Sequence, residues 1–341
     1  MCAQISDSTS SASNADAARL ADEVRQATLS VVWRQWRALG ASAAATSSEH
    51  EPLRSLIDPE ALLLASLLFV EDERRLGDVL HSWASSHSAH MSVQRTKNLA
   101  AAYPASVQGK IASRLAWFAE VAHLTGKDHR WRKAQQDWSL RSADAGAAID
   151  RPVVRGEGKA RGARLRAREP AALLLRLRLV LGVSVKADAL AYLISRPRSS
   201  ATISEIADAL GYTVAAVRRS LDDLVEARVI ESDVENAIAH RAEYSAWAKL
   251  LQLPQEPLVW GYWVARFRWV ADLTGWAKSA EARPLSEYAY AATLREIAVR
   301  NDGAFNSDLS ISRGAEWNTL DGATAYVQAI REGVRRMLSS V

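Results

Sequence analysis

Residues 202–230 restrict the fold of this chain more than any other stretch, because they predict two short helices joined by a tight turn. Thr202 and Glu205 have the spacing of a capping box, in which a hydroxyl and a carboxylate each satisfy a free backbone N–H of the first helical turn. Gly211 predicts the end of this helix, since a residue without a Cβ adopts the left-handed conformation at little cost. Thr213 can then cap a second helix. We therefore predict a helix-turn-helix.

The second predicted helix has one apolar face and one polar face. Its apolar residues recur at helical spacing and are expected to point inward; they are Val214, Val217, Leu221, Leu224 and Val225. The opposite face begins with the small residues Ala215 and Ala216 and continues with Arg218 and Arg219. A slim helix start can enter the major groove of DNA, where Arg binds a guanine edge or a phosphate. The candidate DNA contacts on this helix are Thr213, Ala215, Ala216, Arg218 and Arg219.

A predicted β-hairpin follows the helix pair, with residues 229–232 and 238–244 as its two short strands. Together with the opening helix (ALAYLI) and the pair (ISEIADALGY and TVAAVRRSLDDLVEARVI), the hairpin makes residues 186–244 resemble the winged helix-turn-helix of MarR/ArsR-type transcriptional regulators. The resemblance implies binding of double-stranded DNA by the second helix and by the hairpin, or wing. Arg241 is the candidate contact on the wing. It also implies a homodimer that binds a palindromic operator.

The distribution of charge separates the folded regions from a basic segment. Residues 150–170 hold 7 Lys and Arg against 3 Asp and Glu, whereas residues 1–149 hold 16 of each kind and residues 171–341 hold 20 of each kind. The net charge of +4 therefore belongs to residues 150–170. We predict a flexible linker kept open by charge repulsion. The alternative is an arm that contacts DNA phosphates.

Helical apolar spacing in most of the remaining sequence predicts a mainly α fold, and 341 residues suffice for two or three domains. The single cysteine, Cys2, excludes an intramolecular disulfide and is typical of a reducing cytoplasm. The predicted order is a disordered tail (1–14), a helical N-terminal domain (15–149), a basic flexible linker (150–170), a winged helix-turn-helix (171–246) and a helical C-terminal domain (247–341).

Residues 72–103 have the rhythm of a second helix pair, with Ser92 as the cap of its second helix. One interpretation is a second, degenerate DNA-reading unit. The other is plain packing within a helical bundle, which is the commoner role of two consecutive amphipathic helices. The candidate outward residues of the first interpretation are Gln94, Arg95, Lys97 and Asn98.

An aromatic stripe in residues 258–276 offers a further candidate site. Trp260, Tyr262 and Arg266 are the candidate effector pocket, although aromatic residues at helical spacing are more often core. The charged residues within this stretch argue against a membrane span. His87 and His90 lack a partner at a metal-ligand spacing, and we predict an exposed turn there. Phosphate loops and hydrolase motifs are absent, so we expect no catalytic residues, no metal, no cofactor and no enzyme activity.

The sequence leaves two functions open. The first is a cytoplasmic DNA-binding regulator, of the repressor type, that reads an operator through the winged helix. The alternative is a protein-interaction module, or an antitoxin or phage-defence component, that binds a partner protein and regulates its own operon. Asp233 and Glu235 favour this alternative, because wings that touch DNA usually carry Arg or Lys in the turn.

Overall fold

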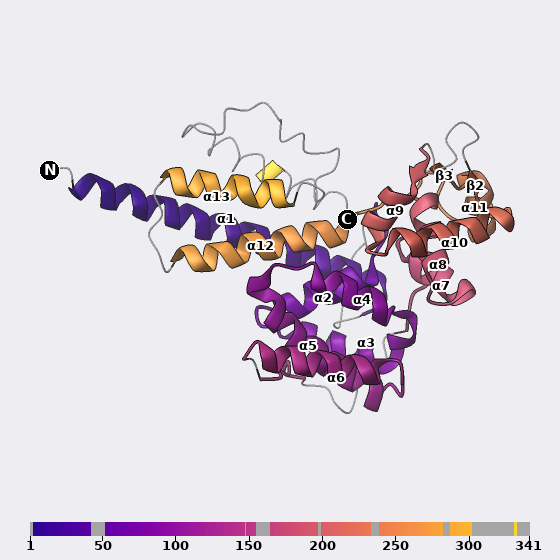
Figure 1. Cartoon of the computed structure of the whole chain (residues 1–341), viewed down its shortest axis with the longest axis horizontal. Coiled ribbons are helices and arrows are strands. Elements are labelled where there is room, and N and C mark those ends of the chain that lie inside the picture. Colours follow the sequence, from indigo (N-terminus) through magenta and orange to yellow (C-terminus); the bar gives the residue numbers. More distant parts are fainter. Residues whose placement is uncertain are drawn as a thin grey trace. The chain divides into compact units, whose positions relative to one another are not determined.

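The computed structural model describes residues 3–41, 52–146, 148–154, 164–196, 199–232, 239–281, 287–301 and 331–332 (Figure 1). Within these ranges the chain is mainly helical and has one three-stranded antiparallel sheet, which confirms the predicted fold class. The backbone groups into two compact units. The first unit comprises Met1–Trp33, Tyr103–Gln108 and Tyr262–Val341; the second comprises Arg34–Ala102 and Gly109–Gly261. This grouping cuts across the predicted domain boundaries.

The first unit contains most of α1 (Ala3–Ala38) and two later helices, α12 (Trp263–Glu281) and α13 (Glu287–Arg300), and Figure 1 shows all three. Helices α12 and α13 pack through Trp276 and Tyr290, and the Asp272 carboxylate accepts hydrogen bonds from the Arg300 and Asn301 side chains at 3.0 Å. Because α1 begins at Ala3, it includes residues that we predicted to be a disordered tail. Residues 302–330 and 333–341 of the predicted helical C-terminal domain lie outside the described residues.

The second unit begins with a tryptophan-rich helical region. Helix α2 (Pro59–Phe69) is buried along its whole length, and the Asp58 carboxylate caps it by accepting a hydrogen bond from the Ala61 N–H at 3.1 Å. Trp36 and Trp83 meet edge to face with ring centroids 5.0 Å apart, which places their large apolar surfaces in the core. The elements of this region are α2 (Pro59–Phe69), α3 (Arg75–His87), η1 (Ser88–His90), α4 (Val93–Ala101), α5 (Ala105–Leu124) and α6 (Trp131–Asp144).

The second unit continues with the predicted helix-turn-helix and its wing. The strand order is β1-β3-β2, with Ala201 opposite His240 and Glu231 opposite Arg241. The turn of the wing, which holds Asp233 and Glu235, lies outside the described residues. The elements are η2 (Pro170–Ala172), α7 (Leu173–Leu181), α8 (Val185–Ile194), β1 (Ala201–Thr202), α9 (Ile203–Leu210), α10 (Val214–Glu226), β2 (Glu231–Ser232), β3 (Ala239–Arg241) and α11 (Tyr244–Leu251).

The basic segment is held at both of its described ends. Asp150 accepts a hydrogen bond from the Arg114 Nε at 2.6 Å, and Arg151 pairs with Glu120 at 2.8 Å. Farther along, the Arg166 N–H donates to the Leu39 carbonyl at 3.2 Å. The described parts of this segment are therefore docked, in contrast to the open linker that we predicted.

Candidate nucleic-acid interface

The helix-turn-helix has the local structure that the sequence predicts. The Thr202 N–H donates to the Glu205 carboxylate at 2.7 Å, and the Glu205 N–H donates to the Thr202 hydroxyl at 3.3 Å. Helix α9 then ends at Gly211, whose φ is 70°. The Thr213 hydroxyl accepts a hydrogen bond from the Ala216 N–H at 3.3 Å and so caps α10. These caps fix where α9 ends and where α10 starts.

The first half of α10 presents an exposed face made of the predicted residues. Thr213, Ala215, Arg218 and Arg219 are exposed, and Ala216 is half-buried. The helix packs inward through Val217, Leu221 and Leu224. The prediction that Val214 points inward was wrong, since 44% of it is exposed. Val214 is the first residue of α10 and precedes the buried seam, which begins at Val217.

The second half of α10 carries negative charge instead. Asp222, Asp223 and Glu226 are exposed, and Asp223 pairs with Lys186 of α8 at 2.6 Å. A phosphate backbone would be repelled by these carboxylates and attracted by the arginines of the first half. The charge along α10 therefore suits a helix that approaches a polyanion with its N-terminal end.

The wing places a carboxylate beside its candidate arginine. The Arg241 Nη2 lies 2.6 Å from the Glu231 Oε2, and these two residues face each other across β2 and β3. Both side chains are more than half exposed, so the pair contributes little to stability. Glu231 nevertheless forms an ion pair with Arg241, which we predicted to contact DNA. A DNA phosphate would have to displace Glu231 from that guanidinium.

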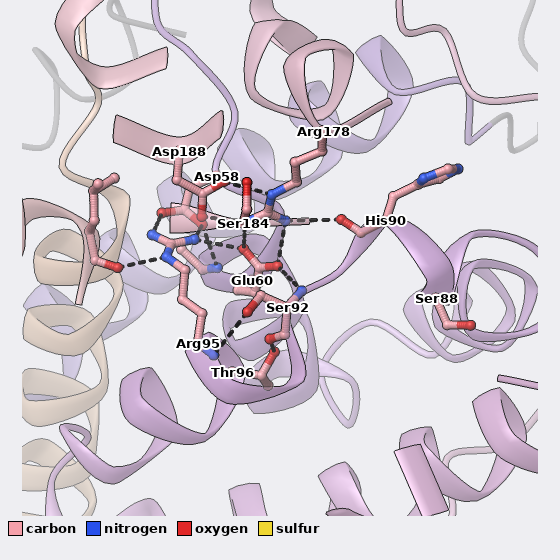
Figure 2. Close-up of polar contacts among 12 residues, drawn as sticks. Asp58, Glu60, Ser88, His90, Ser92, Arg95, Thr96, Arg178, Ser184 and Asp188 are labelled. Carbon is pink, nitrogen blue, oxygen red and sulfur yellow. Dashed lines mark hydrogen bonds and ion pairs between the residues drawn. The ribbon is translucent and has the colours of Figure 1, made fainter. Parts of the chain in front are cut away.

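A group of five buried charged residues lies under the helix-turn-helix, and we call it the ionic cluster. Figure 2 shows Arg95 of α4 and Arg178 of α7 converging on Glu60 at the start of α2. Arg95 contacts Glu60 and Asp58 at 2.6 and 2.5 Å. Arg178 contacts Glu60 and Asp188 at 2.6 and 2.7 Å. The five side chains are at most 2% exposed.

In the ionic cluster, opposite charges in direct contact offset the cost of burying each charge. Burial opposes the charged form of Glu60, but the charges of Arg178 and Arg95 outweigh it and lower the pKa of Glu60 to about 2. Burial likewise opposes the charge of Arg95, yet Asp58 and Glu60 raise the pKa of that guanidinium. Removal of either arginine would therefore leave the buried Glu60 carboxylate without part of its compensating charge.

Side chains of the ionic cluster and of α4 form hydrogen bonds with the turn of the helix-turn-helix. The Arg95 Nε donates to the Leu210 carbonyl at 2.6 Å, and the Asn98 amide donates to the Gly211 carbonyl at 3.0 Å. The Tyr212 hydroxyl donates to the Asp188 carboxylate at 2.9 Å. Burial and the charge of Asp188 raise the pKa of Tyr212, so its hydroxyl keeps the proton that it donates. Three consecutive turn residues are therefore anchored.

The outward Arg95 that a second DNA-reading unit in residues 72–103 would need was a wrong prediction. Arg95 is fully buried, and Asn98 faces the turn of the helix-turn-helix. Lys97 is half-buried and pairs with Asp137 of α6 at 2.6 Å, whereas Gln94 is exposed. The sequence carried one signal of this packing, because two carboxylates at the start of the apolar α2 require buried cations.

The residues of the predicted effector pocket are distributed over the two units. Trp260 is buried in the second unit and meets Tyr192 edge to face with ring centroids 5.3 Å apart. Tyr262 and Arg266 belong to the first unit, where the Arg266 guanidinium lies 5.2 Å from the ring centroid of Trp263. The effector pocket stays a prediction.

Metal-ligand clusters and membrane-spanning helices are both absent from the described ranges. No group of three or more His, Cys, Asp and Glu side chains there could hold a metal ion. His87 and His90, which we predicted to form an exposed turn, are half-buried and stack with ring centroids 6.2 Å apart. None of the described helices combines the length and the apolar character that a membrane span requires.

Residues 189–232 match the model of a bacterial regulatory protein family, the arsR family. The matched residues run from α8 through α10 to the end of β2. No curated protein and no solved structure matches the chain. The match confirms the resemblance of this segment to an ArsR-type winged helix-turn-helix, and it supports DNA-binding transcriptional regulation in general.

Proposed function

We propose that the chain with this arsR-type segment is a DNA-binding transcriptional regulator that acts as a repressor and reads an operator with α10. The observation that carries the proposal is the exposed first half of α10, where Arg218 and Arg219 follow the small residues Ala215 and Ala216 in a capped helix. The narrow N-terminal end of α10 fits the major groove of DNA, and the two arginines supply contacts to guanine edges or phosphates. Such a protein acts in the cytoplasm, where bacterial DNA lies.

The charge of α10 defines how the helix would bind. Its N-terminal half would lie in the groove, while Asp222 and Glu226 would remain outside it. Val214 would add an apolar contact, since an exposed side chain of this kind can pack on the thymine methyl group. Arg241 would leave its ion pair with Glu231 and contact a neighbouring DNA phosphate instead.

We also propose that the regulator is a homodimer on a palindromic operator. The end of α7 exposes Leu179, Val180 and Leu181 by 50%, 75% and 45%. Three consecutive exposed apolar residues are unusual on the surface of a monomer, and a second copy would remove them from water. Sedimentation of the full chain and of a Val180→Glu variant tests this part, because the variant should be monomeric and the parent dimeric.

The test of DNA reading begins with a library of randomised duplexes from which the full chain selects its preferred sequence. An Arg218→Ala/Arg219→Ala variant should lose about 100-fold or more in affinity for the selected duplex. Its salt slope should fall by about 0.9 for each phosphate that is no longer neutralised. The matched control is Arg132→Ala/Lys133→Ala, which removes two adjacent exposed basic residues from α6 in the same unit. Equal affinities of both variants would refute the assignment.

A second candidate is a protein-interaction module, such as an antitoxin that holds a partner protein. The observation in its favour is the negative charge of α10 and of the wing, where Glu231 pairs with Arg241. Binding to random duplex DNA at low salt separates the two candidates. Binding that weakens steeply as salt rises indicates phosphate contacts, whereas no binding at low salt indicates a protein partner.

A further inference from the structure

We infer that α4, a helix outside the arsR-type segment, acts as a brace that positions α10 for base reading, with Asn98 and Arg95 as its positioning residues. The inference rests on the proposed function. It assigns a role in DNA recognition to residues more than a hundred positions before α10, since Asn98 and Gly211 are 113 residues apart in sequence. The brace would make recognition dependent on the N-terminal helices.

First, every residue of the turn is anchored. Leu210 is the last residue of α9, and Gly211 and Tyr212 form the whole connection from it to Thr213, the cap of α10. Each of the three is hydrogen-bonded to α4 or to the ionic cluster. The last carbonyls of a helix have no partner within the helix, and water usually satisfies them. Here a buried guanidinium and an amide bind them instead, so the turn has little freedom to tilt.

Second, α4 lies in direct contact with the turn. A Cβ placed on Gly211 would lie 2.3 Å from the Leu99 Cδ2, so the backbone of the turn touches a buried α4 side chain. Interiors packed in this way transmit displacement rather than absorb it. The turn and α4 therefore move as one body.

Third, α10 is a lever that magnifies any tilt of the turn. Arg219 lies six residues beyond Thr213, which is about 9 Å along an α-helix. A tilt of about 10° at the turn would then move its backbone by roughly 1.5 Å. Sites that read hydrogen-bonding groups lose function when displaced by more than about 0.5 Å. The brace would thus affect discrimination between sequences, while attraction to phosphates tolerates the same displacement.

The experiment uses the full chain with an Asn98→Ala/Tyr212→Phe variant, which removes two anchors without leaving a buried charge. Affinities are measured for the duplex selected by the parent chain and for a random duplex, at a temperature where circular dichroism shows full folding. We expect the ratio of the two affinities to fall about tenfold, comparable to misreading one base pair, with the salt slope on random duplex unchanged. A merely destabilised protein would lose both affinities equally and keep the ratio.

The matched control is Lys97→Ala, on the same helix, which removes the ion pair with Asp137 and leaves the turn untouched. It should keep the parent's ratio. The single Asn98→Ala variant serves if the double variant does not fold, with an expected fall of a few-fold. A ratio equal to that of Lys97→Ala would overturn the inference while leaving the regulator intact. Failure of the parent chain to discriminate between any duplexes would instead overturn the proposed function, and the inference with it.

Discussion

The contact between Gly211 and Leu99 gives a prediction whose magnitude follows from the structure. An alanine at Gly211 would keep φ near 70°, and its Cβ would lie 2.3 Å from the Leu99 Cδ2 and 3.5 Å from the Cγ. The left-handed conformation costs an L-residue about 1–2 kcal/mol. The overlap with a buried side chain adds about 1–3 kcal/mol. We expect Gly211→Ala to lower the free energy of unfolding by about 2–5 kcal/mol.

Two further variants separate these contributions. Gly146 has φ 68°, close to that of Gly211, and a Cβ at that position would meet no atom within 4 Å, so Gly146→Ala should show the conformational cost alone. In a Leu99→Ala background the overlap is absent, and Gly211→Ala should then cost only about 1–2 kcal/mol. Urea unfolding of the full chain, followed by circular dichroism, gives each value. A cost of Gly211→Ala that is the same with and without the Leu99 side chain would refute the packing of α4 against the turn.

Three other predictions concern the ionic cluster, the end of α10 and the wing. The pKa of Glu60 is lowered from 4.5 to about 2, so its contribution to the free energy of unfolding is complete above pH 4.5 and is lost as pH falls towards 2. Glu60→Gln should therefore lower the free energy of unfolding at pH 7 by about 3–5 kcal/mol. It should also make stability depend less steeply on pH in the acid range. Arg228 follows α10 with φ 54°, in a position that favours glycine. Arg228→Gly should therefore raise the free energy of unfolding by about 1 kcal/mol, measured as a higher melting temperature. Glu231→Gln frees Arg241 and should strengthen binding to random duplex a few-fold at low salt, with Glu205→Gln, outside the wing, as a comparison that lacks this gain.

The sequence was most informative where structure depends on neighbouring residues. Thr202, Glu205, Gly211 and Thr213 mark the ends of α9 and α10 through backbone hydrogen bonds that span only a few positions. The start of α2 follows the same local rules, because the Asp58 cap and Pro59 precede an uninterrupted apolar run. Local rules of capping and periodicity therefore predicted the helix-turn-helix and much of the surrounding helical structure.

The ionic cluster was not predictable in the same way. Arg95 stands among Gln94, Lys97 and Asn98, and its own neighbours give it the pattern of a solvated helix face. Its partners Asp58 and Glu60 lie 37 and 35 residues away, and the Leu210 carbonyl lies 115 residues away. Spacing rules do not reach such distances, since the pairing depends on how the helices pack. The candidate interface on α10 could therefore be predicted from the sequence, whereas the ionic cluster that anchors the turn before it could not.

The long sequence separation inside the ionic cluster also sets an order of events during synthesis. Glu60 leaves the ribosome 118 residues before Arg178, the guanidinium that binds both of its oxygens. At a translation rate of about 5–20 residues per second, α2 waits roughly 6–24 s for this partner. Throughout that interval an apolar helix carries a carboxylate that cannot be buried with its full set of partners. The nascent N-terminal helices can therefore complete their buried ion pairs only after α7 has been synthesised.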